Sequence, residues 1–135
     1  MHLKPKFTVR NILVKNMTAD EVAACKTLAF PGDMGCIKDE LDGCLQRPMS
    51  GSRAAMVIER DTNQIVSWGL ASRLHGESSK PAGQFFTHPD YRRMGLGSLA
   101  YQSLAAKMGD MKTYPHDPAS FNFFRTNKGK AINVA

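Results

Sequence analysis

The sequence lacks several features that would place it in a common class of protein. No apolar run approaches the roughly 20 residues that a membrane-spanning helix needs, and the opening stretch MHLKPKFTVR has no apolar core of the kind found in secretory signal peptides. The three cysteines, Cys25, Cys36 and Cys44, form no CxxC pair and cannot all be bridged within the chain. We therefore expect a cytoplasmic protein with free thiols, not inserted in a membrane, and the sequence gives no reason to expect a metal.

Two common phosphate-binding motifs are also missing. There is no GxxxxGK[ST], and no GxGxxG follows a parallel strand. The sequence contains no internal repeat and no low-complexity linker. The 135 residues, 42% hydrophobic and 22% charged, have an ordinary globular composition. One folded domain covering residues 1–135 is expected.

The charge is unbalanced toward the basic side. Eighteen Lys and Arg against twelve Asp and Glu give a net charge of +6. An anionic partner is favoured by this balance, and it could be a phosphorylated cofactor, a nucleic acid or an acidic protein. Simple solubility explains the charge equally well.

The hydrophobic pattern predicts a mixed α/β order with an antiparallel meander in its centre. Residues 7–14, FTVRNILV, are typical of a strand. MTADEVAACKTLAF predicts a helix capped by Thr18 or Asp20 and ended by Pro31 and Gly32, and GCIKDELDGCLQR predicts a second helix. RAAMVIER and QIVSWGLASR, joined by DTN, predict a hairpin, and GQFFT a further strand.

The second half of the chain continues this order. After GQFFT, an apolar stripe at four-residue intervals predicts a helix, with Leu96, Ala100, Leu104 and Met108 on one face and Leu99 beside them. A short strand in MKTY, a helix in PASFNFFRTN and a last strand in AINVA are expected to follow.

The junction FTHPDYRRMGLGS has the features of an anion-binding loop. Pro89 discourages further sheet pairing, so the chain must turn after the strand. Gly95 and Gly97 lack a Cβ, so they can adopt positive φ and let a ligand approach the backbone. The helix that starts near Gly97 directs its free N–H groups at this loop, and Arg92 and Arg93 flank it. These donors would together stabilise phosphate oxygens.

This stretch resembles the acetyl-coenzyme A signature of the GCN5-related N-acetyltransferase (GNAT) superfamily. The family pattern is Arg or Gln, two residues, Gly, one residue, then Gly or Ala, and residues 92–97, RRMGLG, match each defined position. The flanking Pro89 and Tyr91 and the following amphipathic helix match as well. The resemblance, together with the element order, covers nearly the whole chain. It implies a GNAT fold of the mixed α+β class, with a mostly antiparallel sheet of about six strands, about four helices and a shortened C-terminus.

The resemblance also implies an activity and a set of cofactor-binding residues. The expected reaction is transfer of an acetyl group from acetyl-CoA to a primary amine of a small molecule or a protein, by direct attack without a covalent enzyme intermediate. Backbone N–H groups would hold the pyrophosphate, and the unpaired backbone of the preceding strand would bind the pantetheine arm and polarise the thioester. The expected cofactor-binding residues are Phe85, Phe86, Thr87, Arg92, Arg93, Met94, Gly95, Leu96, Gly97, Ser98 and Phe124.

The expected catalytic positions depart from the family pattern. In DPASFNFFRTNKG, Asp117 stands at the usual Asn, Ser120 at the small residue and Phe124 at the Tyr that often protonates the thiolate. Water or Ser120 would have to supply that proton. The strand that often carries a catalytic Glu reads GQFF, so His116 and Asp117 become candidates for the base, with His75 and Glu77 as alternatives.

The acceptor and the oligomeric state stay open at this level. Asp39, Glu40 and Asp42 lie near the expected acceptor side and would suit a cationic amine, although a solvated helix face explains them better. After Gly129 only KAINVA remains, so the final hairpin has room for one strand, and an open sheet edge would favour a homodimer. The alternative function is a weakly catalytic or non-catalytic protein of the same fold that binds a protein or nucleic acid. Nucleic acid is less favoured because the basic residues are scattered.

Overall fold

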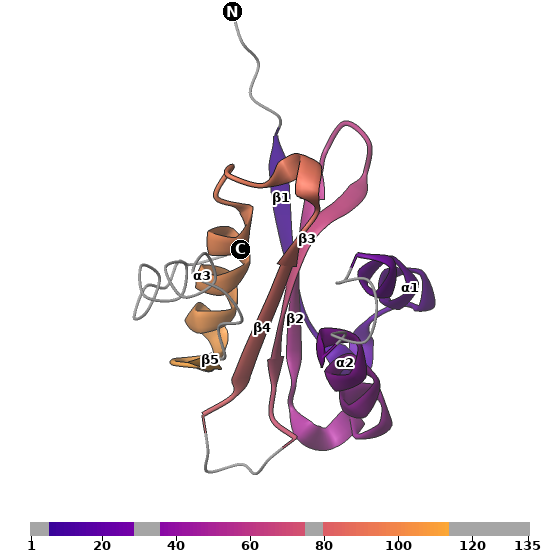
Figure 1. Ribbon diagram of the computed structural model, residues 1–135. Helices are drawn as coiled ribbons and strands as arrows, with labels where there is room; N and C mark the ends of the chain where they lie inside the picture. Colours follow the sequence, from indigo (N-terminus) through magenta and orange to yellow (C-terminus); the bar gives the residue numbers. More distant parts are fainter. Residues whose placement is uncertain (1–5, 29–35, 75–79, 114–135) are drawn as a thin grey trace, which may run out of the picture.

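A computed structural model of the chain describes residues 6–28, 36–74 and 80–113 (Figure 1). The strands are β1 (Phe7–Leu13), β2 (Arg53–Glu59), β3 (Gln64–Ser72), β4 (Ala82–Thr87) and β5 (Lys112–Thr113), and the helices are α1 (Ala19–Thr27), α2 (Cys36–Gln46) and α3 (Leu96–Met108). Three short 3₁₀ turns are η1 (Val14–Asn16), η2 (Pro48–Ser50) and η3 (Pro89–Tyr91). None of the described helices is long and apolar enough to cross a membrane.

The strands form one sheet in the order β1-β2-β3-β4-β5. Neighbours from β1 to β4 pair antiparallel, and β5 pairs parallel to β4 through Ala82 with Lys112 and Gly83 with Thr113. The predicted mixed, mostly antiparallel sheet is thereby confirmed for these strands. The expected sixth strand in AINVA and the expected helix in PASFNFFRTN lie outside the described residues.

Helices cover both faces of the sheet. In Figure 1, α1 and α2 lie on one face and α3 lies on the other. Because successive side chains of a strand point to opposite faces, Trp68 and Leu70 of β3 join the cluster under α1 and α2, whereas Ala71 joins the cluster under α3. The sheet therefore separates two hydrophobic layers.

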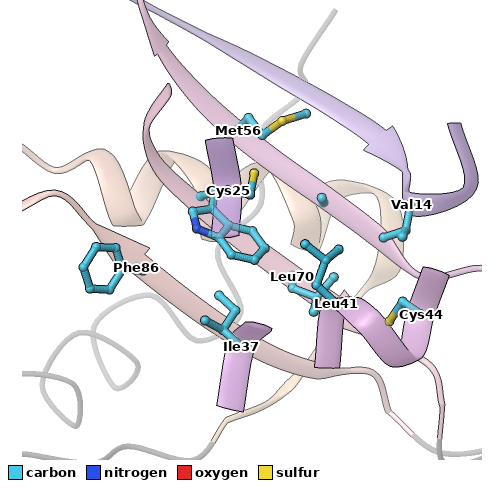
Figure 2. Packing of buried hydrophobic residues seen from close by; sticks show 10 residues of the cluster. Val14, Cys25, Ile37, Leu41, Cys44, Met56, Leu70 and Phe86 are labelled. Carbon is cyan, nitrogen blue, oxygen red and sulfur yellow. The ribbon is translucent and has the colours of Figure 1, made fainter. Parts of the chain in front are cut away.

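The layer under α1 and α2 joins side chains from both helices to the sheet (Figure 2). Its members include buried Cys25, Ile37, Leu41 and Cys44 from the helices and Met56, Leu70 and Phe86 from the strands. Trp68, which is fully buried, also donates its indole N–H to the carbonyl oxygen of Leu28 at 2.6 Å. That bond satisfies the one polar atom of the indole and fixes the end of α1 to the sheet.

The start of α1 is fixed by a capping box, so Thr18 and not Asp20 is the N-cap. The Thr18 hydroxyl accepts from the Glu21 N–H at 3.1 Å, and the Glu21 carboxylate accepts from the Thr18 N–H at 2.9 Å. Two of the unpaired donors of the first turn are thereby satisfied. Glu21 also pairs with Arg10 of β1, and these bonds hold the pKa of Glu21 below its usual value although partial burial acts the other way.

The predicted stripe of α3 packs against the other face of the sheet. Leu96, Ala100 and Leu104 are buried there, and Leu99 and Met108 are packed at the edge of the same cluster. Asn11 of β1 donates to the carbonyl and hydroxyl oxygens of Ser103, both at 2.9 Å, which ties the middle of α3 to the edge strand. The direction of α3, and hence the position of its N-terminus, follows from these contacts.

Gly69 makes room for an aromatic ring, which gives a first prediction. A Cβ at this position would stand 2.4 Å from two ring carbons of Phe85 and 3.2 Å from Leu104. We expect Gly69→Ala to lower the free energy of unfolding by about 1–3 kcal/mol in urea denaturation, because the core would be overpacked. In a Phe85→Leu background the same substitution should cost less. An equal cost in both backgrounds would contradict this packing argument.

The thiols of the buried Cys25 and Cys44 are predicted to be unreactive in the folded protein. Burial, with a smaller effect of Glu21, raises the pKa of Cys25 to about 12, and burial also raises the pKa of Cys44. The thiolate is the reactive form, so neither group should react with a disulfide reagent while the protein is folded. In a Cys36→Ser variant we expect no fast-reacting thiol at pH 8 and two after guanidinium denaturation. One fast thiol in the folded variant would contradict this assignment.

Candidate functional site

The β4–α3 loop, residues 92–95, lies between the end of a strand and the start of a long helix. Thr87 ends β4, and His88 caps η3 by accepting the Asp90 N–H on Nδ1 at 3.1 Å. The four loop residues are exposed, whereas Leu96, the first residue of α3, is 2% exposed. A fixed helix end therefore follows an accessible turn.

The loop makes its turn at Arg93 and Gly95. Arg93 has φ of 67° and Gly95 has φ of 77°, both in the left-handed region. Gly97, which was also expected to use its freedom to adopt positive φ, does not have positive φ and is the second residue of α3. An added Cβ at Gly95 would meet nothing within 4 Å, so the glycine is required by the backbone conformation and open space lies beside it.

The first backbone N–H groups of α3 are not capped by a side chain of the preceding residue. Gly95 is the N-cap and supplies no side-chain hydrogen bond, and its carbonyl accepts from the Leu99 N–H at 3.1 Å. The N–H groups of Leu96, Gly97 and Ser98 precede the first intrahelical bond, so they point toward the loop with the positive end of the helix dipole. Met94, the neighbouring side chain, is 48% exposed. This arrangement has the donors and the accessibility that bound phosphate oxygens need.

The two arginines have different surroundings. Arg92 donates from Nε to the carbonyl oxygen of Thr87 at 3.2 Å, and its guanidinium carbon lies 5.7 Å from the centre of the Phe86 ring. Arg93 is exposed and makes no hydrogen bond among the described residues. Neither guanidinium pairs with an acid within the part of the chain that the structure describes. Arg92 braces the end of β4, and Arg93 leaves its positive charge exposed on the loop.

Strand β4 was expected to bind the pantetheine arm through residues 85–87. Only its backbone can do so, because the Phe85 and Phe86 side chains pack in the core. Phe86 is 7% exposed within the α1/α2 layer, and the Phe85 ring packs against Tyr101 at 5.5 Å between ring centres. Residues 85–87 pair with β3 on one side. On the other side, the described pairing with β5 ends at Gly83 and Thr113. The separation of the two strands beyond this point stays a prediction.

The expected catalytic residues lie outside the described part of the chain. His116, Asp117 and Ser120 belong to residues 114–135, as does Phe124, and the alternative bases His75 and Glu77 belong to residues 75–79. Of the acids expected near the acceptor, Asp42 forms an ion pair with Lys26 and so joins α2 to α1. That pair gives Asp42 a structural role.

One contact near the loop was missed by the sequence reasoning. Glu59 at the end of β2 is 9% exposed, and the proximity of its carboxylate raises the pKa of Tyr91. The only signal in the sequence was an acid directly following the apolar run RAAMVI.

Sequence comparisons with known proteins found nothing. No protein-family model matches the chain, and no curated protein sequence matches it.

Solved structures, in contrast, match over nearly the full length. An aminoglycoside N-acetyltransferase in complex with CoA covers 100% of this chain and 95% of its own, with a TM-score of 0.61 and 14% identity. Glucosamine-6-phosphate N-acetyltransferase from Arabidopsis thaliana covers 96% of this chain and 97% of its own, with a TM-score of 0.55 and 14% identity. Ribosomal-protein-alanine N-acetyltransferase from Brucella melitensis biovar Abortus 2308 covers 96% of each chain, with a TM-score of 0.55 and 10% identity.

These neighbours are N-acetyltransferases, and their likeness extends across the sheet and the helices on both of its faces. The Arg-x-x-Gly-x-Gly motif lies at the β4–α3 junction, where the resemblance expected it. The chain therefore has the fold of the GCN5-related N-acetyltransferase superfamily.

Proposed function

We propose that the protein is an acetyl-CoA-dependent N-acetyltransferase that acts on a primary amine of a small molecule or a protein. The observation that supports this most is the accessible β4–α3 loop, with Gly95 in the left-handed conformation before an uncapped helix N-terminus. It belongs to a fold shared with N-acetyltransferases, one of them in complex with CoA.

The fit of coenzyme A to this loop is supported by the chemistry of the groups present. Backbone N–H groups of residues 94–98 would bind the pyrophosphate, and the open space beside Gly95 leaves room for its oxygens. Arg93 would add positive charge, and the Arg92 contact with Thr87 would keep the end of β4 in place. When bound, acetyl-CoA supplies an acetyl group activated as a thioester.

The residues of this chain would contribute mainly by holding two reactants together. Fixing an amine beside the acetyl carbon removes much of the entropic cost of a bimolecular reaction. Backbone donors of residues 85–87 would stabilise negative charge on the thioester oxygen. His116 or Asp117 would take a proton from the amine, and Ser120 or water would return one to the sulfur. Phe124 stands where related enzymes often have a tyrosine that acts as general acid. The rate of acetyl transfer would therefore be lower than with that tyrosine, by the roughly 10²- to 10⁴-fold that general acid catalysis contributes.

Isothermal titration with acetyl-CoA tests the binding site directly. We expect saturable one-to-one binding to the wild type and a loss of affinity of at least about a hundredfold in Gly97→Asp, because a carboxylate would face the pyrophosphate. Gly97→Asn, which adds a side chain of similar size without charge, should lose less. No binding to the wild type would contradict the proposal and favour a protein of this fold that binds a macromolecule instead.

Substitutions of Arg93 can separate the effect of its charge on acetyl-CoA binding from the effect of its positive φ on stability. Arg93→Gly should bind acetyl-CoA about three- to tenfold more weakly, with a smaller dependence on salt, because one exposed charge is lost. Its free energy of unfolding should be unchanged or up to about 1 kcal/mol higher, because glycine adopts positive φ without a steric penalty. Arg93→Lys should keep most of the affinity. Equal affinity of Arg93→Gly and the wild type would show that this charge takes no part in binding.

A further inference from the structure

Strand β1 forms an edge of the described sheet. Its seven residues, Phe7–Leu13, pair with β2 on one side, and within residues 6–28, 36–74 and 80–113 no strand pairs with it on the other side. None of the seven residues is buried, whereas most residues of β2 are. The outer side of β1 is therefore accessible along the whole strand.

The backbone groups of alternate residues in β1 point away from β2. The Val14 N–H donates to the Ser52 carbonyl at 2.9 Å, and the Arg60 N–H donates to the Lys6 carbonyl at 3.0 Å, at opposite ends of one continuous register. Because hydrogen-bonded pairs alternate with non-hydrogen-bonded pairs in an antiparallel ladder, the even-numbered residues of β1 bond to β2. The odd-numbered residues direct their N–H and C=O groups outward, and these are Phe7, Val9, Asn11 and Leu13.

This edge lacks the features that usually keep exposed strands apart. Sheet edges are commonly protected by a short strand, a bulge, a proline or an unpaired charge. Strand β1 has seven residues in unbroken register with β2 and contains no proline. Its one charged side chain, Arg10, is paired with Glu21 of α1, whose carboxylate accepts from Nε at 2.5 Å. An unprotected edge of this length is suited to pairing with another strand.

The backbone of β1 is complementary to that of a second copy. If two β1 strands pair antiparallel about a twofold axis at Arg10, Phe7 lies opposite Leu13 of the second copy, and Val9 lies opposite Asn11 of the second copy. All the outward-facing residues are then in hydrogen-bonded pairs. A shift of the register by two residues in either direction leaves one outward-facing residue of each copy without a partner in the strand.

The side chains along this edge match in the same register. Phe7 and Leu13 would meet as an apolar pair on the face of the sheet that α3 covers. Arg10 would lie opposite its own copy at the axis, where two like charges are unfavourable. Each guanidinium is already paired with Glu21, so the four side chains at the axis together carry no net charge.

We propose that the outer edge of β1 is a dimer interface, through which two copies of the chain form one continuous sheet with their β1 strands paired antiparallel about Arg10. Pairing of two strands buries less surface than the roughly 1,600 Å² of a standard interface, so a dissociation constant of about 1–100 μM is expected. Strands β2 and β3 separate this edge from β4 and the loop that follows it. Dimerisation therefore needs no coenzyme and does not depend on the proposed function.

Amide hydrogen exchange resolved by residue tests the pairing in the unmodified chain. In the monomer the outward amides of Val9 and Asn11 should exchange fast, and those of Thr8 and Arg10 slowly, because only the latter are bonded to β2. Raising the protein concentration through the range in which sedimentation equilibrium detects the dimer should slow exchange of Val9 and Asn11 at least about fivefold and leave the other two unchanged. A protein that stays monomeric up to about 1 mM would overturn the proposal, as would dimerisation without protection of Val9 and Asn11.

Leu13→Pro removes one outward N–H from each copy. Leu13 has φ of −60°, which proline adopts without strain, and its side chain is in neither hydrophobic cluster of the described residues, so the fold should be kept. The dissociation constant of the dimer should rise at least about tenfold. Leu13→Ala, which keeps the N–H, is the matched control and should raise it less than about threefold. Equal effects of the two variants would overturn the backbone pairing.

Arg10→Glu tests the register and leaves the backbone of the edge intact. It places four carboxylates at the twofold axis, where like charges repel. The dissociation constant should rise at least about tenfold at low ionic strength and by a smaller factor in about 0.5 M salt. A dimer of unchanged stability in this variant would show that the axis does not lie at Arg10 and would overturn the proposed register.

Discussion

The pairing of β4 with β3 is the constraint on which the rest of the site depends. Phe85 and Phe86 point to opposite faces of the sheet, one against Tyr101 and the other into the α1/α2 layer. A slip of one residue would exchange these two faces, and the ring of Phe85 fits only because Gly69 opposite it has no side chain. The register therefore determines where Thr87 ends the strand, and with it where the loop and the start of α3 lie.

The regular elements were predictable because each carries a local signal. The near-continuous apolar runs of β2 and β3 reflect burial on both faces of the sheet, because members of each strand belong to both hydrophobic clusters. The four-residue spacing in α3 reflects burial on one face of the helix. The cap of α1 was predictable only to a choice between Thr18 and Asp20. The spacing of Thr18 and Glu21 decides it, since a capping box needs an acid three residues after the cap.

The details of the site were less predictable because they depend on contacts between distant segments. The motif indicated two glycines free to adopt positive φ, but the helix begins at Leu96, so Gly97 is helical and Arg93 takes the second left-handed position. The edge-on contact between Phe7 of β1 and Tyr91 of η3 joins segments that are far apart in the chain, and no local pattern encodes it. The catalytic assignments to His116, Asp117, Ser120 and Phe124 stay predictions, since they fall outside the described residues.

The left-handed conformation of Arg93 is the least expected feature of the loop and the one that argues most directly for an anionic ligand. A residue with a long side chain costs of order 1–3 kcal/mol in a sparsely populated backbone region, and glycine or asparagine would avoid most of this cost. Arg93 has no partner among the described residues that would offset it. Arg92, one residue earlier, is bonded to Thr87 and lies over Phe86. An exposed guanidinium held at an unfavourable φ beside an uncapped helix end contributes little to stability, whereas its charge adds to the helix dipole in attracting phosphate.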